Sequence, residues 1–265
     1  MKDGKVDQPF EEQINELAEI KKKYPDIVFP FICADPRRNN IVELVKNAVN
    51  NLGFAGIKLY PPLGYYPFDQ RLYPVYEFAQ EKGIPVISHC SKGVIYYHGK
   101  IKDEVLVHPK TGERLQRREN KDFFNEYTNP DNYKYLLKDF PKLKVCLAHF
   151  GGETDWNNYL FNPKGLFEKE SDNWFWKVRK ILEEFPNAFA DISFTLNKVR
   201  FLPLLKVLML DSKINHKILF GTDYYMVELE TSERAFSLSV RAFLGEENFK
   251  MIAHDNPRRF LFEKT

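Results

Sequence analysis

The 265-residue sequence predicts an α/β fold, in which a parallel β-sheet is covered by helices. Short apolar segments alternate along the chain with longer segments whose apolar residues recur at helical spacing. The short segments are nearly continuous in apolar residues, which is typical of parallel strands buried on both faces. Strand–helix units of this kind connect in a right-handed sense, so the sheet either opens as a doubly wound fold or closes as a barrel.

Six segments are predicted to be strands, because a turn residue follows each apolar run. They are residues 26–36, 54–62, 84–91, 142–152, 187–193 and 217–225. A closed barrel of this class has eight strands in about 250 residues, and here the first predicted element is a helix. We therefore expect a TIM-barrel-like (β/α)8 fold that is incomplete at its N-terminus, with strands one and two absent.

The helices are predicted from apolar spacing and from the residues that begin or end them. The first helix places apolar residues from Phe10 to Ile20 at helical spacing, and Pro25 stops it. The predicted helices are residues 10–23, 39–53, 72–83, 129–141, 173–186, 201–210 and 232–245, followed by a helical pair at 246–262.

A long polar segment, residues 92–130, interrupts the alternation of strands and helices. It contains "HPKTGE", a sequence typical of a hairpin turn. The segment is too long for a plain connection inside a compact domain. We interpret residues 1–265 as a single barrel domain in which this excursion is a lid over a site, with a small inserted domain as the alternative.

Composition and charge favour a near-neutral globular protein. The net charge is +2, and the basic runs, such as residues 117–118, are short and scattered, which does not predict nucleic-acid binding. Residues 1–13 lack the apolar core of a signal peptide, and no apolar run reaches the ~20 residues of a membrane span. Cys33, Cys90 and Cys146 are an odd number of cysteines without framework spacing, so we expect reduced thiols and a cytoplasmic location. An open barrel edge would favour a homo-oligomer.

Polar side chains stand at the carboxyl ends of four predicted strands. They are Lys58, His89, His149 and Asp223. In a parallel barrel these ends form one face, on which the active site is built, and imidazole and carboxylate groups suit zinc and similar ions. Each residue also has a structural alternative: either histidine as a satisfied polar group, Asp223 as a helix cap, and Lys58 as a side chain that reaches the surface. Cys90 would suit a thiol nucleophile, but neighbouring strand residues face opposite sides, so we expect it in the core.

Five segments resemble, in their order and spacing, the strand-end motifs of the amidohydrolase superfamily. They are "GFAGIKLYPP", "PVISHCS", "KVCLAHFGG", "ILFGTDYY" and "DNPRRFLF". The resemblance covers residues 27–262 and is to the amidohydrolase-related group, which contains metal-dependent hydrolases and related decarboxylases. It implies a distorted (β/α)8 barrel with a divalent metal ion at its mouth, for which zinc is the expected ion.

The resemblance also implies a role for each strand-end residue. His89 matches the strand-five histidine, a metal ligand. His149 matches the strand-six histidine, which contacts the metal-bound water or the substrate. Asp223 matches the strand-eight aspartate, which binds the metal, takes a proton from the attacking water and returns it to the leaving group. Lys58 lies where some relatives with two metal ions carry a carbamylated lysine, and we expect it to contact the substrate.

The His-x-His pair that this family carries on strand one is absent from the sequence, whose first histidine is His89. Catalytic zinc normally has three protein ligands, so His89 and Asp223 alone are an incomplete set. The first hypothesis is a truncated metal-dependent hydrolase that attacks a small carboxylate-bearing or cyclic substrate with metal-bound hydroxide. A nonoxidative decarboxylase using the same site is a close variant. The alternatives are a non-catalytic binding module that kept the scaffold, or a partner chain that closes the barrel.

Overall fold

The computed structural model describes residues 9–93, 95–116, 119–161 and 172–263, and it confirms the α/β architecture. The described residues contain a six-stranded sheet whose neighbouring strands all pair in parallel, in the order in which they occur in the chain. The strands are β1 (Phe31–Cys33), β2 (Gly56–Leu59), β3 (Val86–Ser91), β4 (Val145–Gly151), β5 (Ala188–Asp191) and β6 (Ile218–Leu219). All six predicted strands are therefore present, each shorter than the segment that predicts it.

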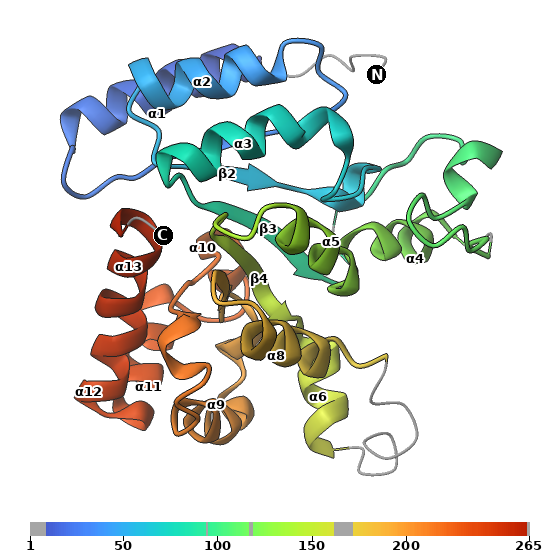
Figure 1. Ribbon diagram of the computed structural model, residues 1–265. Coiled ribbons are helices and arrows are strands. Elements are labelled where there is room, and N and C mark those ends of the chain that lie inside the picture. The colour runs from blue at the N-terminus through green and yellow to red at the C-terminus, as the bar shows by residue number, and fades with distance from the viewer. Residues whose placement is uncertain (1–8, 94, 117–118, 162–171, 264–265) are drawn as a thin grey trace.

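Helices cover the sheet, as Figure 1 shows. Helices α2 and α3 pack together near β2, and α8 packs against β4 and β5. The helices are α1 (Phe10–Lys23), α2 (Ile41–Asn51), α3 (Tyr73–Lys82), α4 (Asn120–Asn125), α5 (Asp131–Asp139), α6 (Glu153–Phe161), α8 (Trp174–Glu184), α9 (Leu202–Met209), α10 (Tyr224–Val227), α11 (Glu233–Leu244), α12 (Glu246–Lys250) and α13 (Asn256–Phe262). Helices α4, α6 and α10 were not predicted, because they are short and lack a sustained apolar stripe.

The ends of the predicted helices follow local chemistry. The side chain of Ser232 accepts a hydrogen bond from the backbone of Ala235 and so begins α11. Asn173 caps α8 in the same way, by accepting a bond from Trp176. Gly83 ends α3 at a φ of 72°, a left-handed conformation that glycine adopts without steric cost.

One face of the sheet is turned toward the interior of the barrel. A row of residues crosses this face in register, from Cys33 through Lys58, Ile87 and Cys146 to Phe189. The interior at this row is largely apolar. The buried ring of Phe260, on α13, packs in a cluster with Cys146 and Phe189 of the row and with Leu219. The polar side chains are therefore collected at the other end of the sheet, where the strands end.

The two outer strands of the sheet are β1 and β6, and the C-terminal helices lie between them. The backbone N–H of Phe220 donates to the carbonyl of Ile252 at 2.8 Å, and Asn256 donates from its side chain to the carbonyl of Ile218 at 2.8 Å. At the other side, the ring of Phe262 meets Phe29, just before β1, with ring centroids 5.2 Å apart. The end of the chain thus connects both edges of the sheet.

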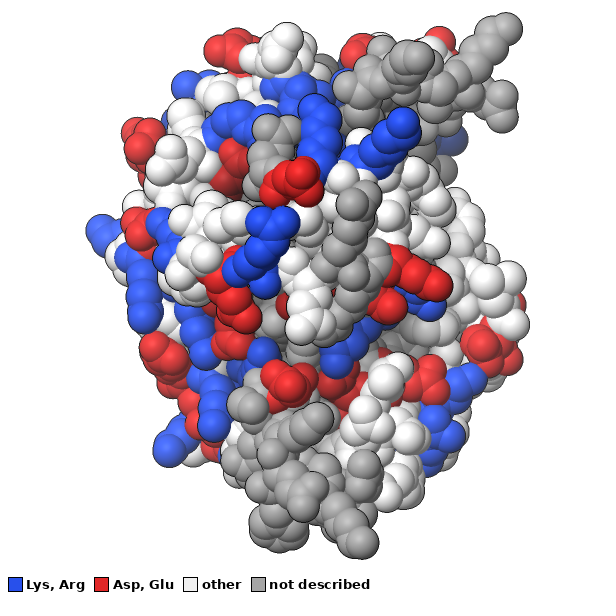
Figure 2. Space-filling view, turned by 90° about the vertical axis from the view of Figure 1, so that its right-hand side faces the viewer, with Lys and Arg blue, Asp and Glu red and all other residues white. Residues whose placement is uncertain are grey.

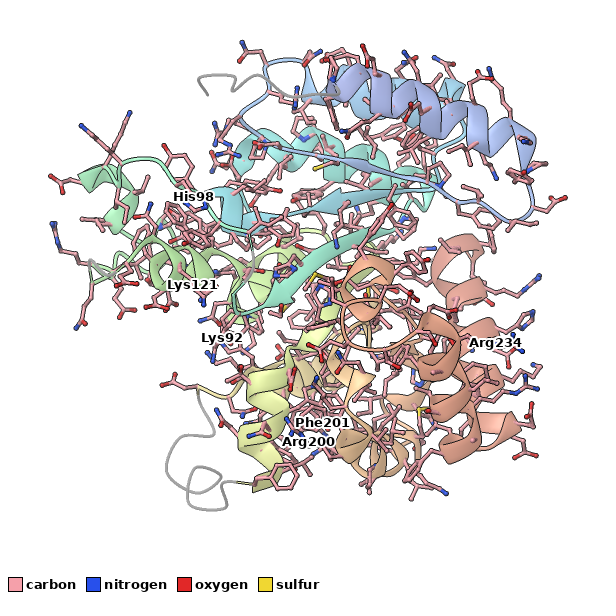
Figure 3. All side chains as sticks on the ribbon, turned by 180° about the vertical axis from the view of Figure 1, so that it is seen from behind. Lys92, His98, Lys121, Arg200, Phe201 and Arg234 are labelled. Atoms are coloured by element: carbon pink, nitrogen blue, oxygen red, sulfur yellow. The ribbon has the colours of Figure 1, made fainter. Side chains whose placement is uncertain are left out.

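The excursion at residues 92–130 packs around an apolar cluster of its own. The cluster contains Leu106, Phe123, Phe124 and Tyr127, together with Tyr66 and Phe68 from the segment after β2. The predicted hairpin is present, because the N–H of His108 donates to the carbonyl of Glu113 at 2.9 Å. Figure 3 shows His98 and Lys121 on this projecting excursion and Lys92 where it leaves β3. Its function as a lid stays a prediction.

Charges of both signs are mixed on one face of the molecule. On the face shown in Figure 2, lysine and arginine side chains are interspersed with aspartate and glutamate. Among the helices of the described ranges, none combines the length and the apolar character that crossing a membrane requires. The three cysteines are free thiols, and burial raises the pKa of Cys90 well above its usual value, which opposes the nucleophile alternative and agrees with its predicted place in the core.

Candidate active site

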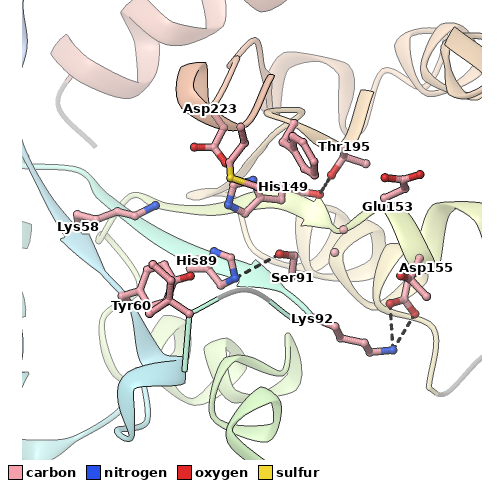
Figure 4. Close-up of a pocket in the computed structure, with 16 residues that line it drawn as sticks. Lys58, Tyr60, His89, Ser91, Lys92, His149, Glu153, Asp155, Thr195 and Asp223 are labelled. Carbon is pink, nitrogen blue, oxygen red and sulfur yellow. Dashed lines mark hydrogen bonds and ion pairs between the residues drawn. The ribbon is translucent and has the colours of Figure 1, made fainter. Parts of the chain in front are cut away.

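A cavity of about 420 Å³ opens at the carboxyl ends of the strands, and it brings all four predicted residues together. Figure 4 shows them around the cavity. Lys58 comes from β2, His89 from β3, His149 from β4 and Asp223 from the segment after β6. The remaining lining residues are Tyr60, Ser91, Lys92, Ile95, Gly151, Gly152, Glu153, Thr154, Asp155, Phe194, Thr195 and Met226.

His89 is a buried, neutral imidazole. It is 3 % exposed, and burial, with smaller contributions from His149 and Lys58, lowers its pKa well below the usual value. Its ring stacks on Tyr60 with centroids 4.5 Å apart, and its Nε2 lies 3.2 Å from the hydroxyl of Ser91. A neutral imidazole keeps one nitrogen lone pair, as a metal ligand or a hydrogen-bond acceptor requires.

His149 reaches the cavity through an irregular end of β4. Strict alternation from Cys146, which faces the interior, would place His149 on the outer face. Instead His149 has a φ of 66° and Phe150 a φ of 45°, and the pairing of β3 with β4 shifts register near this point. Irregularities of this kind re-aim side chains and are common beside active sites. The half-buried ring of His149 therefore lines the cavity.

Glycine allows the chain to continue from this turn. Gly152 has a φ of 89°, and a Cβ atom there would lie 2.7 Å from the Cβ of Ser91. The ends of β3 and β4 can approach this closely only because residue 152 lacks a side chain. The approach places His89 and His149 side by side, with ring centroids 4.8 Å apart.

Asp223 lies at the N-terminal end of α10 with a φ of 54°, and its side chain makes no capping hydrogen bond. The capping alternative is therefore not what the structure shows. Among the residues that the structure describes, no hydrogen bond or ion pair involves its carboxylate, which is exposed at the cavity. The predicted strand 217–225 also ends earlier than expected, at Leu219, so Asp223 belongs to the turn that follows it.

Lys58 likewise has no partner within the described part of the chain. Its side chain is half-buried on β2 and lines the cavity rather than extending freely over the surface, and no described residue forms a hydrogen bond or ion pair with its ammonium group. Burial raises the pKa of the phenol of nearby Tyr60. The carboxylate of Asp223 adds to this rise, and a hydrogen bond with the backbone of Ile95 partly offsets it. The tyrosine therefore stays neutral, and Lys58 is the positive group at this end of the cavity.

The opposite end of the cavity holds ion pairs that the sequence reasoning missed. Lys92 Nζ lies 2.9 Å from the carboxylate of buried Asp155, which also accepts the backbone N–H of Trp174 at 3.0 Å. Glu153 pairs with Arg200 at 3.1 Å. The acidic residues after Gly-Gly could have indicated these contacts, but pairs formed across distant segments leave no local pattern.

Two further residues contact His149 from the end of β5. Asp191 and Ser193, both buried, bond to its backbone and ring. Asp191 lies inside the predicted strand "NAFADIS" and ends the observed strand β5, so it is, like the four predicted residues, a polar group near a strand end. The sequence reasoning passed over it, although this signal could have found it.

The donor set does not fit a complete three-ligand metal site. His89 and His149 offer two adjacent imidazoles, and Asp223 offers a carboxylate on the same cavity. Within residues 9–93, 95–116, 119–161 and 172–263, however, no group of three histidine, cysteine, aspartate or glutamate side chains lies close enough to hold one ion. Catalytic zinc usually takes three protein ligands, so these residues do not form a complete catalytic zinc site.

The family of the chain follows from its whole length. The family model described as "Amidohydrolase" matches residues 1–262, so this protein belongs to that amidohydrolase family. A comparison with functionally curated proteins gave no match.

Solved structures with the same fold are TIM barrels. An uncharacterized TIM-barrel protein from Bordetella bronchiseptica has a TM-score of 0.57 and 21 % identity, over 94 % of this chain and 71 % of that one. A 2,6-dihydroxybenzoate decarboxylase from Rhizobium has a TM-score of 0.57 and 17 % identity, over 95 % and 76 %. A dihydroxybenzoic acid decarboxylase from Polaromonas sp. JS666, with bound manganese and the inhibitor 2-nitroresorcinol, has a TM-score of 0.59 and 16 % identity, over 95 % and 74 %. At these identities the likeness establishes the TIM-barrel-like fold.

Proposed function

We propose that this protein is a hydrolase that cleaves a C–N or C–O bond of a small carboxylate-bearing or cyclic substrate in the strand-end cavity. One observation carries the proposal. The ammonium of Lys58, the imidazole of His149 and the carboxylate of Asp223 line the same cavity, and neither Lys58 nor Asp223 has a partner among the described side chains. General acid–base catalysis on an anionic substrate requires a cation that binds the substrate and, beside it, groups that can accept and donate protons.

Lys58 is the proposed substrate-binding residue. Lys58 is half-buried, and its charge is one cause of the lowered pKa of His89. An anionic substrate group bound to Lys58 would neutralise this charge in a partly desolvated place, where a charge-assisted hydrogen bond is strong. The substrate class that we propose, small carboxylates, follows from this cation, which has no partner among the described residues.

His149 and Asp223 are the proposed catalytic residues. In the proposed reaction, water forms a new C–O bond at the substrate carbonyl while its proton passes to one of these groups. The C–N or C–O bond to the leaving group then breaks, and the same proton returns to the leaving atom. Proton transfer by positioned side chains typically contributes about 10²–10⁴-fold to a rate.

We also propose that His89 and Asp223 are ligands of a zinc ion. These two residues supply only part of the ligand set that a catalytic zinc ion usually has. When bound, such an ion would polarise the substrate and lower the pKa of water. Neutral His89 and unpaired Asp223 support this assignment, whereas the absence of a third donor among the described residues opposes tight binding.

A second candidate function is nonoxidative decarboxylation. It is favoured by two of the structures described above, which are decarboxylases of dihydroxybenzoates. The C–C bond to the carboxylate would break with release of CO2, and a proton from His149 or Asp223 would take its place on the carbon. Lys58 would hold the substrate in either reaction.

The test is an assay of the purified chain on small carboxylate-bearing amides, esters and lactones, and on 2,6-dihydroxybenzoate, with and without ZnCl2 or MnCl2. The variants are His149→Gln and Asp223→Asn, and the matched control is His254→Gln, an exposed histidine on the C-terminal helices. Hydrolysis lost in the first two variants and kept in the control supports the proposal. Release of CO2 instead supports the decarboxylase, and binding without turnover of any compound supports the non-catalytic binding module.

A further inference from the structure

Three side chains that follow one another at alternate positions hold His149 from the end of β5. Asp191 Oδ1 accepts the backbone N–H of His149 at 3.0 Å. The hydroxyl of Ser193 lies 3.0 Å from its Nδ1, and the hydroxyl of Thr195 donates to its carbonyl at 2.7 Å. We call these three residues the His149 clamp; Figure 4 shows the contact from Thr195.

The directions of these hydrogen bonds fix the position of one proton. The hydroxyl of Ser193 contacts both His149 and the carboxylate of Asp191, and since a carboxylate only accepts, the single hydroxyl proton goes to Asp191. Nδ1 of His149 also lies 3.2 Å from the carbonyl oxygen of Ser193, which likewise only accepts. Nδ1 must therefore carry the proton, and in the neutral ring Nε2 keeps the lone pair.

Both carboxylate oxygens of Asp191 have partners in this arrangement. Its Oδ1 accepts from the backbone of His149, from the backbone of Ser193 at 3.0 Å and from the Ser193 hydroxyl, while the thiol of Cys146 lies 3.6 Å from Oδ2. The residue is 8 % exposed, and a carboxylate buried to this degree is costly unless such donors satisfy it. Its role is therefore to hold its neighbours.

The clamp holds His149, a residue whose backbone has an uncommon conformation. His149 has a left-handed φ of 66°, which is uncommon for a residue with a side chain, and strict strand alternation would turn its ring away from the cavity. Bonds to its N–H, its ring and its carbonyl oppose relaxation to an extended conformation. Among the described residues no side chain hydrogen-bonds Nε2, so that nitrogen is left for a ligand or a substrate.

We propose that Asp191 and Ser193 are positioning residues, which hold His149 as its Nδ1–H tautomer with the Nε2 lone pair available to the cavity. The use of that lone pair as a base rests on the proposed function, whereas the tautomer itself does not. The hydroxyl of Thr195 completes the clamp by fixing the peptide on the other side of the residue.

Nitrogen NMR of the full chain labelled with ¹⁵N-histidine tests the proposal, because the two imidazole nitrogens have distinct shifts in each tautomer. The chain has 6 histidines, and the signal that disappears in His149→Gln identifies the one concerned. We expect Nδ1–H in the unsubstituted chain and an increased share of Nε2–H in Ser193→Ala, with Ser193→Thr restoring the original tautomer. Ser91→Ala is the matched control, since it removes a hydroxyl from the other site histidine, His89.

An Nε2–H tautomer in the unsubstituted chain would overturn the proposal, and this result does not depend on whether any variant folds. A tautomer that is the same in Ser193→Ala and in Asp191→Ala, both folded by circular dichroism, would also overturn it. Because the spectra are recorded without substrate, loss of the proposed function and loss of this inference are separate outcomes: a chain that hydrolyses nothing can still show the clamped tautomer.

Discussion

The imidazole rings of His89 and His149 meet edge to face at the ends of adjacent strands, with centroids 4.8 Å apart. Two imidazoles at this separation can contact one ion, but the described residues add no third donor close enough to complete a site. The two histidines therefore line the cavity together, but they do not by themselves form a complete metal site.

A zinc titration separates these roles. We expect calorimetry with ZnCl2 to show weak binding, with a Kd of about 1 μM or above, because two or three imperfectly placed ligands replace a preformed set. His89→Gln should abolish the heat, and His254→Gln should leave it unchanged. Nanomolar binding that persists in His89→Gln would contradict the assignment of His89 as a ligand.

Lys58 should determine affinity for anions. Replacing it by methionine removes the unpaired ammonium from the cavity, and a hydrogen bond to a charged group is worth about 1.5–3 kcal/mol. We therefore expect the Kd for benzoate or 2,6-dihydroxybenzoate to rise roughly 10- to 100-fold in Lys58→Met. Calorimetric titration of each ligand measures the change.

Two controls isolate the charge at Lys58. Lys121→Met removes one positive charge from the exposed part of the excursion, and it should leave the affinity unaltered. Benzamide, a neutral analogue of the same shape, should bind Lys58→Met and the original chain equally. An equal loss of benzoate affinity in Lys58→Met and Lys121→Met would mean that net charge, and not this side chain, attracts the anion.

The sequence predicted the six strands and the four residues that line the cavity for a simple physical reason. Parallel strands buried on both faces are continuous apolar runs, and the polar residue that ends each run must lie at the common edge of the sheet. For Lys58 and His89 the alternation of side chains then also gives the correct face, since Lys58 pairs in register with inward-facing Ile87.

The rest of the site depends on features that leave no such pattern. His149 faces the cavity only because its backbone and that of Phe150 are left-handed. Neither histidine nor phenylalanine favours that conformation, so the sequence does not predict it. The hydrogen bonds between His149 and the hydroxyls of Ser193 and Thr195 join segments that lie 44 and 46 residues apart in the chain. Only the folded chain reveals such contacts.

Trp156 packs against the left-handed turn at the end of β4 and should contribute strongly to the stability of the fold. The residue is fully buried, its ring packs against Phe150 and Phe175, and its indole donates to the carbonyl of Phe150 at 2.9 Å. Trp156→Ala should lower the free energy of unfolding by about 3–5 kcal/mol through the cavity it leaves. Trp156→Phe should cost about 1–3 kcal/mol, because the Phe150 carbonyl loses its donor.

Urea unfolding followed by circular dichroism measures both changes. Tyr225→Ala is the control, since that aromatic ring is 84 % exposed and its loss should change stability by less than about 0.5 kcal/mol. If Trp156→Ala proved no more destabilising than Tyr225→Ala, the packing that holds the β4 turn would have been misassigned.

Lys144 gives the chain a stability that depends on pH. Burial lowers the pKa of this lysine to about 8, although its ammonium donates to the backbone carbonyl of Glu263 at 2.8 Å. Between pH 8 and the ordinary lysine pKa of about 10.4, the unfolded chain binds more protons at this position than the folded chain does. The contribution of Lys144 to the free energy of unfolding therefore rises with pH across that window and is constant below it.

The difference between the original chain and Lys144→Met isolates this contribution, because cysteines and tyrosines that titrate in the same range are common to both. We expect the original chain to gain about 1 kcal/mol or more relative to Lys144→Met when urea unfolding is repeated at about pH 9.5 instead of pH 7. Lys138→Met, which removes an exposed lysine near the end of α5, should show no such change. Parallel stability curves for Lys144→Met and the original chain would show that Lys144 is protonated equally in the folded and unfolded states.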